Sequence, residues 1–293
     1  MDPRGTVLVT GASSGIGRDA ALYLNEIGYS VVGTVRRAGD ADALRSAAAR
    51  SDAMHPEICD VTSPEQVAAL RDRVQEISGA TGLTAMFSNA GVANMRGDVS
   101  AEGCPVDTLD HLMQVNYLGS VRVIQAHLPL LRASRGTLVI NSALMTHTVL
   151  PFNGGYAPSK AALETWADGL RREIRPYGVR VVIIRASEIA SALDSKQDAS
   201  TVPDGGPYPE QRAFIAGALV SMQRDSGRTS LQPRRVSELV ARIVQQRRPP
   251  LKPITGGHSR AIWLIGMLPE RLQDAIIGKI IRRMARALAP PGT

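Results

Sequence analysis

TVLVTGASSGIGRDAALYLNEIG, at residues 6–28, joins a short apolar run to a glycine-rich turn and then to a segment with helical periodicity. The run at 6–10 alternates little, which is typical of a parallel strand covered by helices on both faces. Gly11, Gly15 and Gly17 let the backbone approach a pyrophosphate, whose charge the N-terminus of the next helix attracts. The GxxxGxG spacing differs from the common GxGxxG fingerprint, so an ordinary turn of small residues is the alternative.

Further apolar runs follow at regular intervals and predict the rest of a sheet. The next strand is expected in YSVVGTV, from residue 29, and later strands at 54–61, 83–91, 136–142 and 179–186. Helical segments alternate with these runs. The alternation predicts an α/β fold with a doubly wound parallel sheet, a Rossmann-type three-layer sandwich, followed by a C-terminal helical extension. In such sheets, ligands bind beyond the carboxyl ends of the strands.

The end of the second strand indicates which dinucleotide the turn binds. Val35 stands about where an acidic residue would bind the adenosine ribose hydroxyls, and Arg36 and Arg37 follow it. A guanidinium pairs well with a 2′-phosphate, and Arg18 could reinforce the basic patch. We therefore expect NADP(H) to be preferred, with NAD(H) as the other cofactor. The opposing interpretation is that these are surface arginines of a basic chain.

Polar or small residues also end the third and fourth strands. Asp60 could accept a hydrogen bond from the adenine amino group, and the small residues of 89–91 could lie against the adenosine half of the cofactor. The helix after Asp60 is expected to begin with Ser63 as N-cap and Pro64 at its first position. Gln66 would then close a capping box.

GGYAPSKAAL contains Tyr156 and Lys160, which are four residues apart and so share one helix face. A phenol normally loses its proton near pH 10, and a nearby ammonium favours the phenolate, so the pair could exchange protons near neutral pH. Alone, the pattern is weak, because many helices carry it by chance, and the simpler interpretation is a Tyr packed on the core beside a solvated Lys. Asn116 interrupts the apolar face of a predicted helix at 107–131 and must satisfy its amide with backbone or water.

Taken together, these motifs resemble the short-chain dehydrogenase/reductase family, in its single-domain subgroup with a Tyr-Lys active site. TGASSGIG, Asp60-Val61, NAG, VNYLG, a serine ending the fifth strand, and YAPSK occur in family order over roughly residues 5–190. The region around Tyr156 is most similar to members that act on steroids, retinol and related lipids. The resemblance implies a cofactor site made of Gly11, Ser13, Ser14, Gly15, Ile16, Gly17, Arg36, Asp60, Val61, Asn89, Ala90, Gly91, Tyr156, Lys160 and Ile189.

The resemblance also implies the catalytic roles. Tyr156 would be the acid/base, and Lys160 would bind the nicotinamide ribose and lower the pKa of the phenol. Ser142 would hydrogen-bond the substrate oxygen, and Asn116 would hold a water in a proton relay. The family usually forms dimers or tetramers through the helices that carry Asn116 and Tyr156, so a homo-oligomer is expected.

One departure from the family pattern concerns the serine. Counted from Gly136, the family's serine position falls on Ala143, one residue after Ser142. Side chains alternate faces along a strand, so this slip could aim the hydroxyl away unless a bulge restores it. Thr146 and Thr148 could substitute.

A second departure follows the sixth strand, where the family usually has Pro-Gly. Here Ala186 and Ser187 replace that pair, which adds a side chain near the nicotinamide. The backbone of Ile189 is expected to meet the carboxamide, and Ser191 stands where the family commonly has Thr.

The sequence therefore predicts an NADP(H)-dependent oxidoreductase that interconverts a primary or secondary alcohol and its carbonyl on a small hydrophobic, lipid-, steroid- or retinoid-like substrate. The alternative is a catalytically weak or inactive NADP(H)-binding regulator or scaffold of the same fold. Residues 1–250 would form a Rossmann-type dinucleotide-binding and catalytic domain, with 187–230 as the substrate lid. Residues 251–293 would form a basic amphipathic C-terminal extension.

Composition restricts the location and the cofactors of the chain. Its 293 residues are 44% hydrophobic, enough for a full core. Two cysteines, and a start that enters the first strand at once, predict a reduced, cytoplasmic protein without a signal peptide. No apolar run approaches the roughly 20 residues of a membrane span. The histidines are scattered and no metal-ligand spacing occurs, so no metal is expected.

Basic residues concentrate near the C-terminus. Residues 228–293 hold 13 Lys+Arg and 3 Asp+Glu, a charge of +10, so 1–227 sum to −3 within a chain of +7. Residues 269–288 place apolar and basic side chains on different helix faces, which predicts a basic amphipathic helix. It could dock on the body, lie on the anionic inner face of the cell membrane, or form an oligomer contact. Nucleic acid is not expected, because aromatic stacking residues are lacking.

Overall fold

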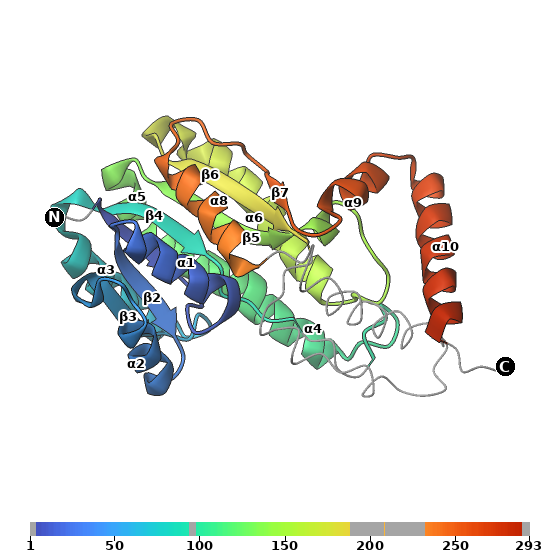
Figure 1. Ribbon diagram of the computed structural model, residues 1–293, viewed down its shortest axis with the longest axis horizontal. Coiled ribbons are helices and arrows are strands. Elements are labelled where there is room, and N and C mark those ends of the chain that lie inside the picture. The colour runs from blue at the N-terminus through green and yellow to red at the C-terminus, as the bar shows by residue number, and fades with distance from the viewer. Residues whose placement is uncertain (1–3, 94–97, 188–207, 209–231, 289–293) are drawn as a thin grey trace.

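The computed structural model describes residues 4–93, 98–187, 208 and 232–288. Its strands form one parallel sheet with the order β3-β2-β1-β4-β5-β6-β7, so the direction of winding reverses between β1 and β4 (Figure 1). This confirms the doubly wound parallel sheet. The strands are β1 (Thr6–Val9), β2 (Ser30–Val35), β3 (Met54–Ile58), β4 (Leu83–Ser88), β5 (Thr137–Ala143), β6 (Arg180–Ala186) and β7 (Ile254–Thr255).

Helices cover both faces of the sheet, which explains why its central strands β1, β4, β5 and β6 are mostly apolar and buried. Val7 and Val9 of β1 are buried in the core shared with α1 and α8, whereas Leu8 between them is buried in the core shared with α3, α5 and α6. The predicted three-layer sandwich is therefore confirmed. One layer contains α1 (Gly15–Glu26), α2 (Ala38–Ser46) and α8 (Pro233–Gln245), and the other contains α3 (Pro64–Ser78), α5 (Ser120–Ser134) and α6 (Tyr156–Ile174).

The segment predicted as one helix at 107–131 has three parts. It consists of α4 (Val106–Leu112), a π-helical stretch η3 (Met113–Gly119) and α5. The π-helical stretch contains Asn116, the residue that interrupts the apolar pattern. Such stretches are rare and occur frequently at functional sites.

The third strand ends earlier than predicted because the chain turns at Asp60. The Asp60 carboxylate accepts hydrogen bonds from the N–H of Thr62 at 2.8 Å and from its hydroxyl at 2.6 Å. Ser63 caps α3 as predicted, accepting from the N–H of Gln66 at 3.2 Å, and Pro64 opens the helix. The expected closure of the capping box is wrong, since the Gln66 side chain accepts from the N–H of Asp60 at 2.8 Å instead.

Residues after Pro250 contribute to the sheet, which the sequence did not predict. β7 pairs with β6, and two helices follow, α9 (Ser259–Gly266) and α10 (Glu270–Leu288), beyond the edge of the sandwich (Figure 1). α9 packs on the loop after β5, where the Thr148 hydroxyl donates to the Ile262 carbonyl at 2.8 Å. α10 confirms the predicted helical extension, and the boundary at 250 stays a prediction.

Two further expectations concern the lid and the membrane. Apart from Ser187 and Tyr208, the predicted lid at 187–230 lies outside the described residues, as do Ile189 and Ser191. Within the described ranges, no helix combines the length and the apolarity that crossing a membrane requires.

Candidate active site

The glycine turn between β1 and α1 is packed too closely for any larger residue. Gly11 has φ of +71°, and a Cβ there would lie 2.9 Å from the Cα of Ala90. A Cβ at Gly17 would lie 2.2 Å from the Gly11 carbonyl oxygen. The N-cap residue of α1, Ser14, makes no side-chain capping bond, so its hydroxyl does not occupy the first N–H groups of the helix. The turn therefore has the form of an anion-binding helix start.

A cleft of about 610 Å³ at the carboxyl ends of the strands brings most of the predicted cofactor residues together. Gly17, Asn116 and Ser142 do not line it. The predicted residues that line it are Gly11, Ser13, Ser14, Gly15, Ile16, Arg36, Asp60, Val61, Asn89, Ala90, Gly91, Tyr156 and Lys160. Lining residues that the sequence did not single out include Thr34, Thr62, Val92, His111, Gln114 and Asn141.

One end of the cleft is basic and also carries the Asp60 carboxylate. The pKa of Asp60 is lowered, first by the Thr62 side-chain and backbone hydrogen bonds and to a smaller extent by the charge of Arg36. Asp60 is therefore an ionised acceptor. Arg37 forms an ion pair with Asp40 at 3.3 Å, and both residues line the cleft with Arg36.

Asn89 fixes the floor of the cleft between three strands. Its amide nitrogen donates to the Thr10 carbonyl at 3.1 Å, and its amide oxygen accepts from the Asn141 side chain at 2.9 Å. The Thr10 hydroxyl accepts from the N–H groups of both Asn89 and Ala90. The side-chain oxygen of Asn141 is buried and has no hydrogen-bond partner among the described residues. The glycine cradle and this unpaired acceptor in the cleft lining both fit a bound dinucleotide.

Tyr156 and Lys160 lie together at the other end of the cleft, on the first turns of α6. The Lys160 side chain is buried, and its ammonium donates to the Asn141 carbonyl at 3.0 Å. Burial lowers the pKa of Lys160 to about 8, and the charge of Glu164 partly opposes this shift. The Lys160 nitrogen lies 5.9 Å from the centre of the Tyr156 ring. The predicted pair therefore meets in the cleft, with a buried cation beside the phenol.

The Asn116 amide is satisfied by protein groups. Its oxygen accepts from the Val92 N–H at 2.8 Å, and its nitrogen donates to the Val92 carbonyl at 2.9 Å and to the Ser159 hydroxyl at 3.0 Å. Asn116 thereby joins the segment after β4 to the helix that carries Tyr156. Its predicted role in holding a water stays a prediction.

Ser142 points to the side of β5 opposite Asn141. Its hydroxyl donates to the buried carboxylate of Glu164 at 2.8 Å. β5 pairs with β6 in unbroken register through Ala143, so no bulge restores the direction of the serine. The Thr146 hydroxyl also donates to Glu164, at 2.6 Å. Contact of Ser142 with the substrate stays a prediction, and no sequence pattern singles out Glu164 beyond its spacing from Lys160.

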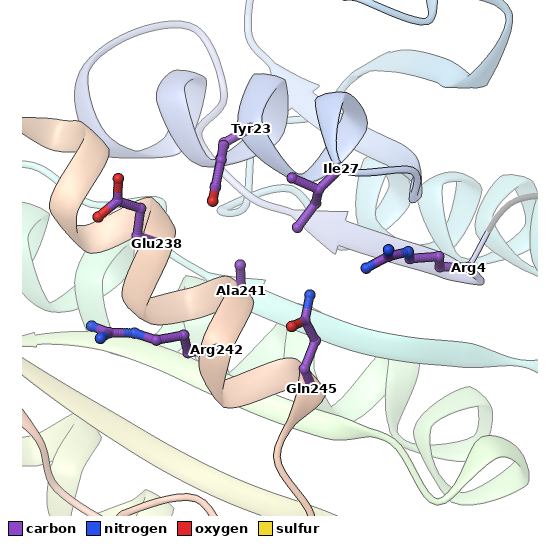
Figure 2. Close-up of a pocket in the computed structure, with 7 residues that line it drawn as sticks. All are labelled: Arg4, Tyr23, Ile27, Glu238, Ala241, Arg242 and Gln245. Atoms are coloured by element: carbon purple, nitrogen blue, oxygen red, sulfur yellow. The ribbon is translucent and has the colours of Figure 1, made fainter.

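A second hollow, of about 490 Å³, lies between α1 and α8 (Figure 2). Tyr23 of α1 and Ile27, which caps that helix, face Ala241 and Gln245 of α8 across it, and Arg4, just before β1, closes one end. It is therefore near the amino end of β1, away from the cleft. None of the predicted site residues lines it.

Comparisons with known proteins agree with this geometry. The family model described as short chain dehydrogenase matches residues 5–201. Retinol dehydrogenase 5 of Mus musculus is 28% identical over 97% of this chain and 91% of its own length. Estradiol 17-beta-dehydrogenase 2 of Mus musculus is 36% identical over 66% of this chain and 50% of its own length.

Solved structures share the fold. A short-chain dehydrogenase from Streptomyces avermitilis has a TM-score of 0.75 at 23% identity, covering 97% of this chain and 99% of that one. A short chain dehydrogenase from Burkholderia cenocepacia J2315, in complex with NADP, has a TM-score of 0.65 at 20% identity, covering 99% and 100%. Because the family model spans more than half of the chain and its motifs meet in one cleft, the protein belongs to the short-chain dehydrogenase family, oxidoreductases that act on alcohols or carbonyls with NAD(P).

Proposed function

We propose that the protein is an NADP(H)-dependent oxidoreductase that interconverts a primary or secondary alcohol and its carbonyl on a hydrophobic substrate. The observation that carries this proposal is that Tyr156 and Lys160 share one cleft with the glycine turn and Arg36. Arg36 and the lack of a carboxylate at Val35 support NADP(H) over NAD(H). The substrate class is supported by relatives named as dehydrogenases of retinol and estradiol, both lipophilic alcohols.

In the proposed reaction, a dinucleotide held by the glycine turn, Arg36 and Lys160 would supply or take up the hydride at the substrate carbon. The hydroxyl of Tyr156 gives or takes the proton at the substrate oxygen. Lys160, oriented by the Asn141 carbonyl, stabilises the phenolate and would hold the cofactor ribose. Since its pKa is about 8, the ammonium form predominates at neutral pH and is lost as the pH rises through that value.

The remaining cofactor contacts follow from the lining of the cleft. The glycine turn and the start of α1 would bind the pyrophosphate, and Asp60 would accept from the adenine amino group. The Ile189 backbone contact and the water held near Asn116 belong to this proposal as expectations from the family resemblance.

A second candidate function is a weakly active or inactive NADP(H)-binding regulator. The observation that favours it is the engagement of Ser142 by Glu164, together with Ala143 at the family's serine position. Such a chain would keep the cofactor cleft and lack a hydroxyl that helps to bind the substrate oxygen.

Fluorescence titration with NADPH and NADH, followed by a screen of hydrophobic alcohols and ketones, tests both candidates. The enzyme proposal expects tighter binding of NADPH than of NADH, and turnover of at least one lipophilic substrate class. Tight NADPH binding with no turnover across the screen would favour the regulator. Absence of binding to either dinucleotide would contradict both.

We also propose that the protein is cytoplasmic and contacts the anionic inner face of the membrane through its C-terminal part, 269–288. Leu272 and Ile280 of α10 are 52% and 45% exposed, and the basic side chains of Lys279 and Arg283 on the same helix are exposed as well. Exposed apolar side chains can bury in a membrane surface while cations contact anionic lipid. Flotation with anionic vesicles tests this against a chain ending at Leu268, which keeps β7. Equal flotation of the two chains would contradict it. Assembly into a homo-oligomer through α5 and α6 stays a prediction.

A further inference from the structure

Glu164 is a carboxylate buried behind the cleft, with only 4% of the residue exposed. It accepts from the hydroxyls of Ser142 at 2.8 Å and Thr146 at 2.6 Å. It also forms ion pairs with Arg185 at 2.8 Å and Lys252 at 3.5 Å. A buried carboxylate needs several such donors to offset its desolvation. These donors come from β5, the turn η4 (Leu144–Thr146), β6 and the segment before β7.

Two of these donors hold the end of β5 on either side of Ala143. The hydroxyl of Ser142 reaches Glu164 from within the strand. The hydroxyl of Thr146 lies within hydrogen-bond distance of both Glu164, at 2.6 Å, and the carbonyl of Ala143, at 2.8 Å, and these two acceptors share its one proton. Glu164 therefore fixes the backbone of β5 at the point where the strand passes into η4.

The residue before Ser142 binds the Lys160 ammonium through its backbone. The carbonyl of Asn141 accepts from the Lys160 ammonium at 3.0 Å. Glu164 lies four residues after Lys160 on α6, so the two side chains are neighbours on one face of that helix. The two side chains are also linked through β5. The Glu164 carboxylate accepts from the Ser142 hydroxyl, and the carbonyl of the preceding residue, Asn141, accepts from the Lys160 ammonium.

We propose that Glu164 is a positioning residue for Lys160. By accepting hydrogen bonds from Ser142 and Thr146, it fixes the position of the Asn141 carbonyl, which accepts from the Lys160 ammonium. This rests on the proposed role of Lys160 toward the cofactor and adds to it a supporting role for Ser142. Among the residues that the structure describes, the titratable groups around the ammonium are Tyr156 and Glu164. The cations of Arg185 and Lys252 lie against the same carboxylate.

The first measurement needs no cofactor. Lys160 in the full chain is labelled with acetic anhydride over a range of pH, and the extent of labelling is read by mass spectrometry. Glu164→Gln should move the midpoint of Lys160 labelling to lower pH, because the ammonium loses both a nearby negative charge and a fixed acceptor. Glu164→Asp keeps the charge and should restore most of the wild-type midpoint.

The second measurement is the NADPH dissociation constant, from fluorescence titration. Glu164→Gln should raise it roughly tenfold, the equivalent of losing one good hydrogen bond from the Lys160 ammonium to the ribose. Ser142→Ala removes one hydroxyl without leaving a buried charge unpaired, so it serves if Glu164→Gln does not fold. Ser142→Ala should lower the pH midpoint of Lys160 labelling and raise the NADPH dissociation constant, each by less than Glu164→Gln does.

Asp168→Asn is the matched control. Asp168 lies four residues further along α6 and pairs with Lys252 at 2.7 Å and with Arg171 at 3.3 Å, but not with β5. Its replacement should leave the Lys160 midpoint and the NADPH constant unchanged.

Three results would overturn the inference: a wild-type midpoint in Glu164→Gln, a wild-type midpoint in Ser142→Ala, or an equal change in Asp168→Asn. A wild-type chain that does not bind NADPH contradicts the proposed function instead. The labelling of Lys160 still decides the role of Glu164 in that case.

Discussion

The ammonium nitrogen of Lys160 lies 5.9 Å from the centre of the Tyr156 ring, one helical turn along α6. The Asn141 carbonyl holds that nitrogen from the β5 side, at 3.0 Å. A positive charge near a phenol favours the phenolate, so the phenol can exchange a proton with a substrate oxygen. The two side chains should therefore respond differently to replacement.

Replacement of Tyr156 by Phe should abolish most of the turnover. The ring and its packing remain, but the hydroxyl that moves the proton is lost, which typically costs about 10²–10⁴-fold in rate. The affinity for NADPH should stay within about twofold, because the pyrophosphate contacts and the contact of Lys160 with the ribose are untouched. Steady-state kinetics and fluorescence titration measure the two quantities.

Tyr177→Phe is the control for this change, since Tyr177 is 57% exposed in the turn after α6. It should have wild-type turnover. Substantial turnover in Tyr156→Phe would mean that another group carries the proton.

Replacement of Lys160 by Met should change the pH dependence of stability in the cofactor-free protein. The pKa of Lys160 falls from 10.5 to about 8 on folding, so between these values the unfolded chain binds more protons than the folded one. The free energy of unfolding of the wild type therefore rises across this window, by roughly 3 kcal/mol from this group. Lys160→Met lacks that rise and should be the more stable protein below pH 8.

Denaturant unfolding of both proteins at several pH values measures this difference. The advantage of Lys160→Met should shrink from pH 8 to pH 10.5. Lys279→Met, at an exposed position of α10, should show no such trend. A difference between Lys160→Met and wild type that is independent of pH would contradict the burial of an ionised lysine.

Replacement of Arg36 by Ala should reduce the preference for NADPH. A hydrogen bond to a charged group contributes about 1.5–3 kcal/mol, so the NADPH dissociation constant should rise roughly tenfold to a hundredfold. The NADH constant should change little, because NADH has no 2′-phosphate. Arg45→Ala, at an exposed position of α2, is the control. If Arg36→Ala lowered the affinities for NADPH and NADH equally, Arg36 would not bind the 2′-phosphate.

Much of the fold could be predicted because its signals are local. The apolar strand, the glycine turn and the helix of 6–28 lie within one short stretch, and β1 and α1 form there. β7 was missed because Ile254–Thr255 is only two residues long. Its pairing with β6 depends on the rest of the sheet, which no local pattern reveals.

In the site, too, the residues with local sequence signals could be predicted, and those that depend on distant residues could not. The residues of the glycine turn and the YxxxK pair were found because chemistry and spacing are visible together. Glu164 was missed because its burial depends on Arg185 and Lys252, which lie 21 and 88 positions further along the chain. The direction of the Ser142 hydroxyl depended on whether β5 contained a bulge, and the paired register shows none.

The register of β5 leads to a prediction about Ala143. Asn141 and Ala143 are two residues apart and share one side of the strand, and Asn141 lines the cleft. Ala143→Ser would therefore add a hydroxyl on the cleft side, where a donor could bind the developing charge on the substrate oxygen. Turnover should rise on the order of tenfold, with NADPH affinity unchanged. Ala143→Cys adds a similar volume with a weak donor and should give little gain. If Ala143→Ser turns over no faster than wild type and Ala143→Cys, then that side of β5 does not face the reacting oxygen.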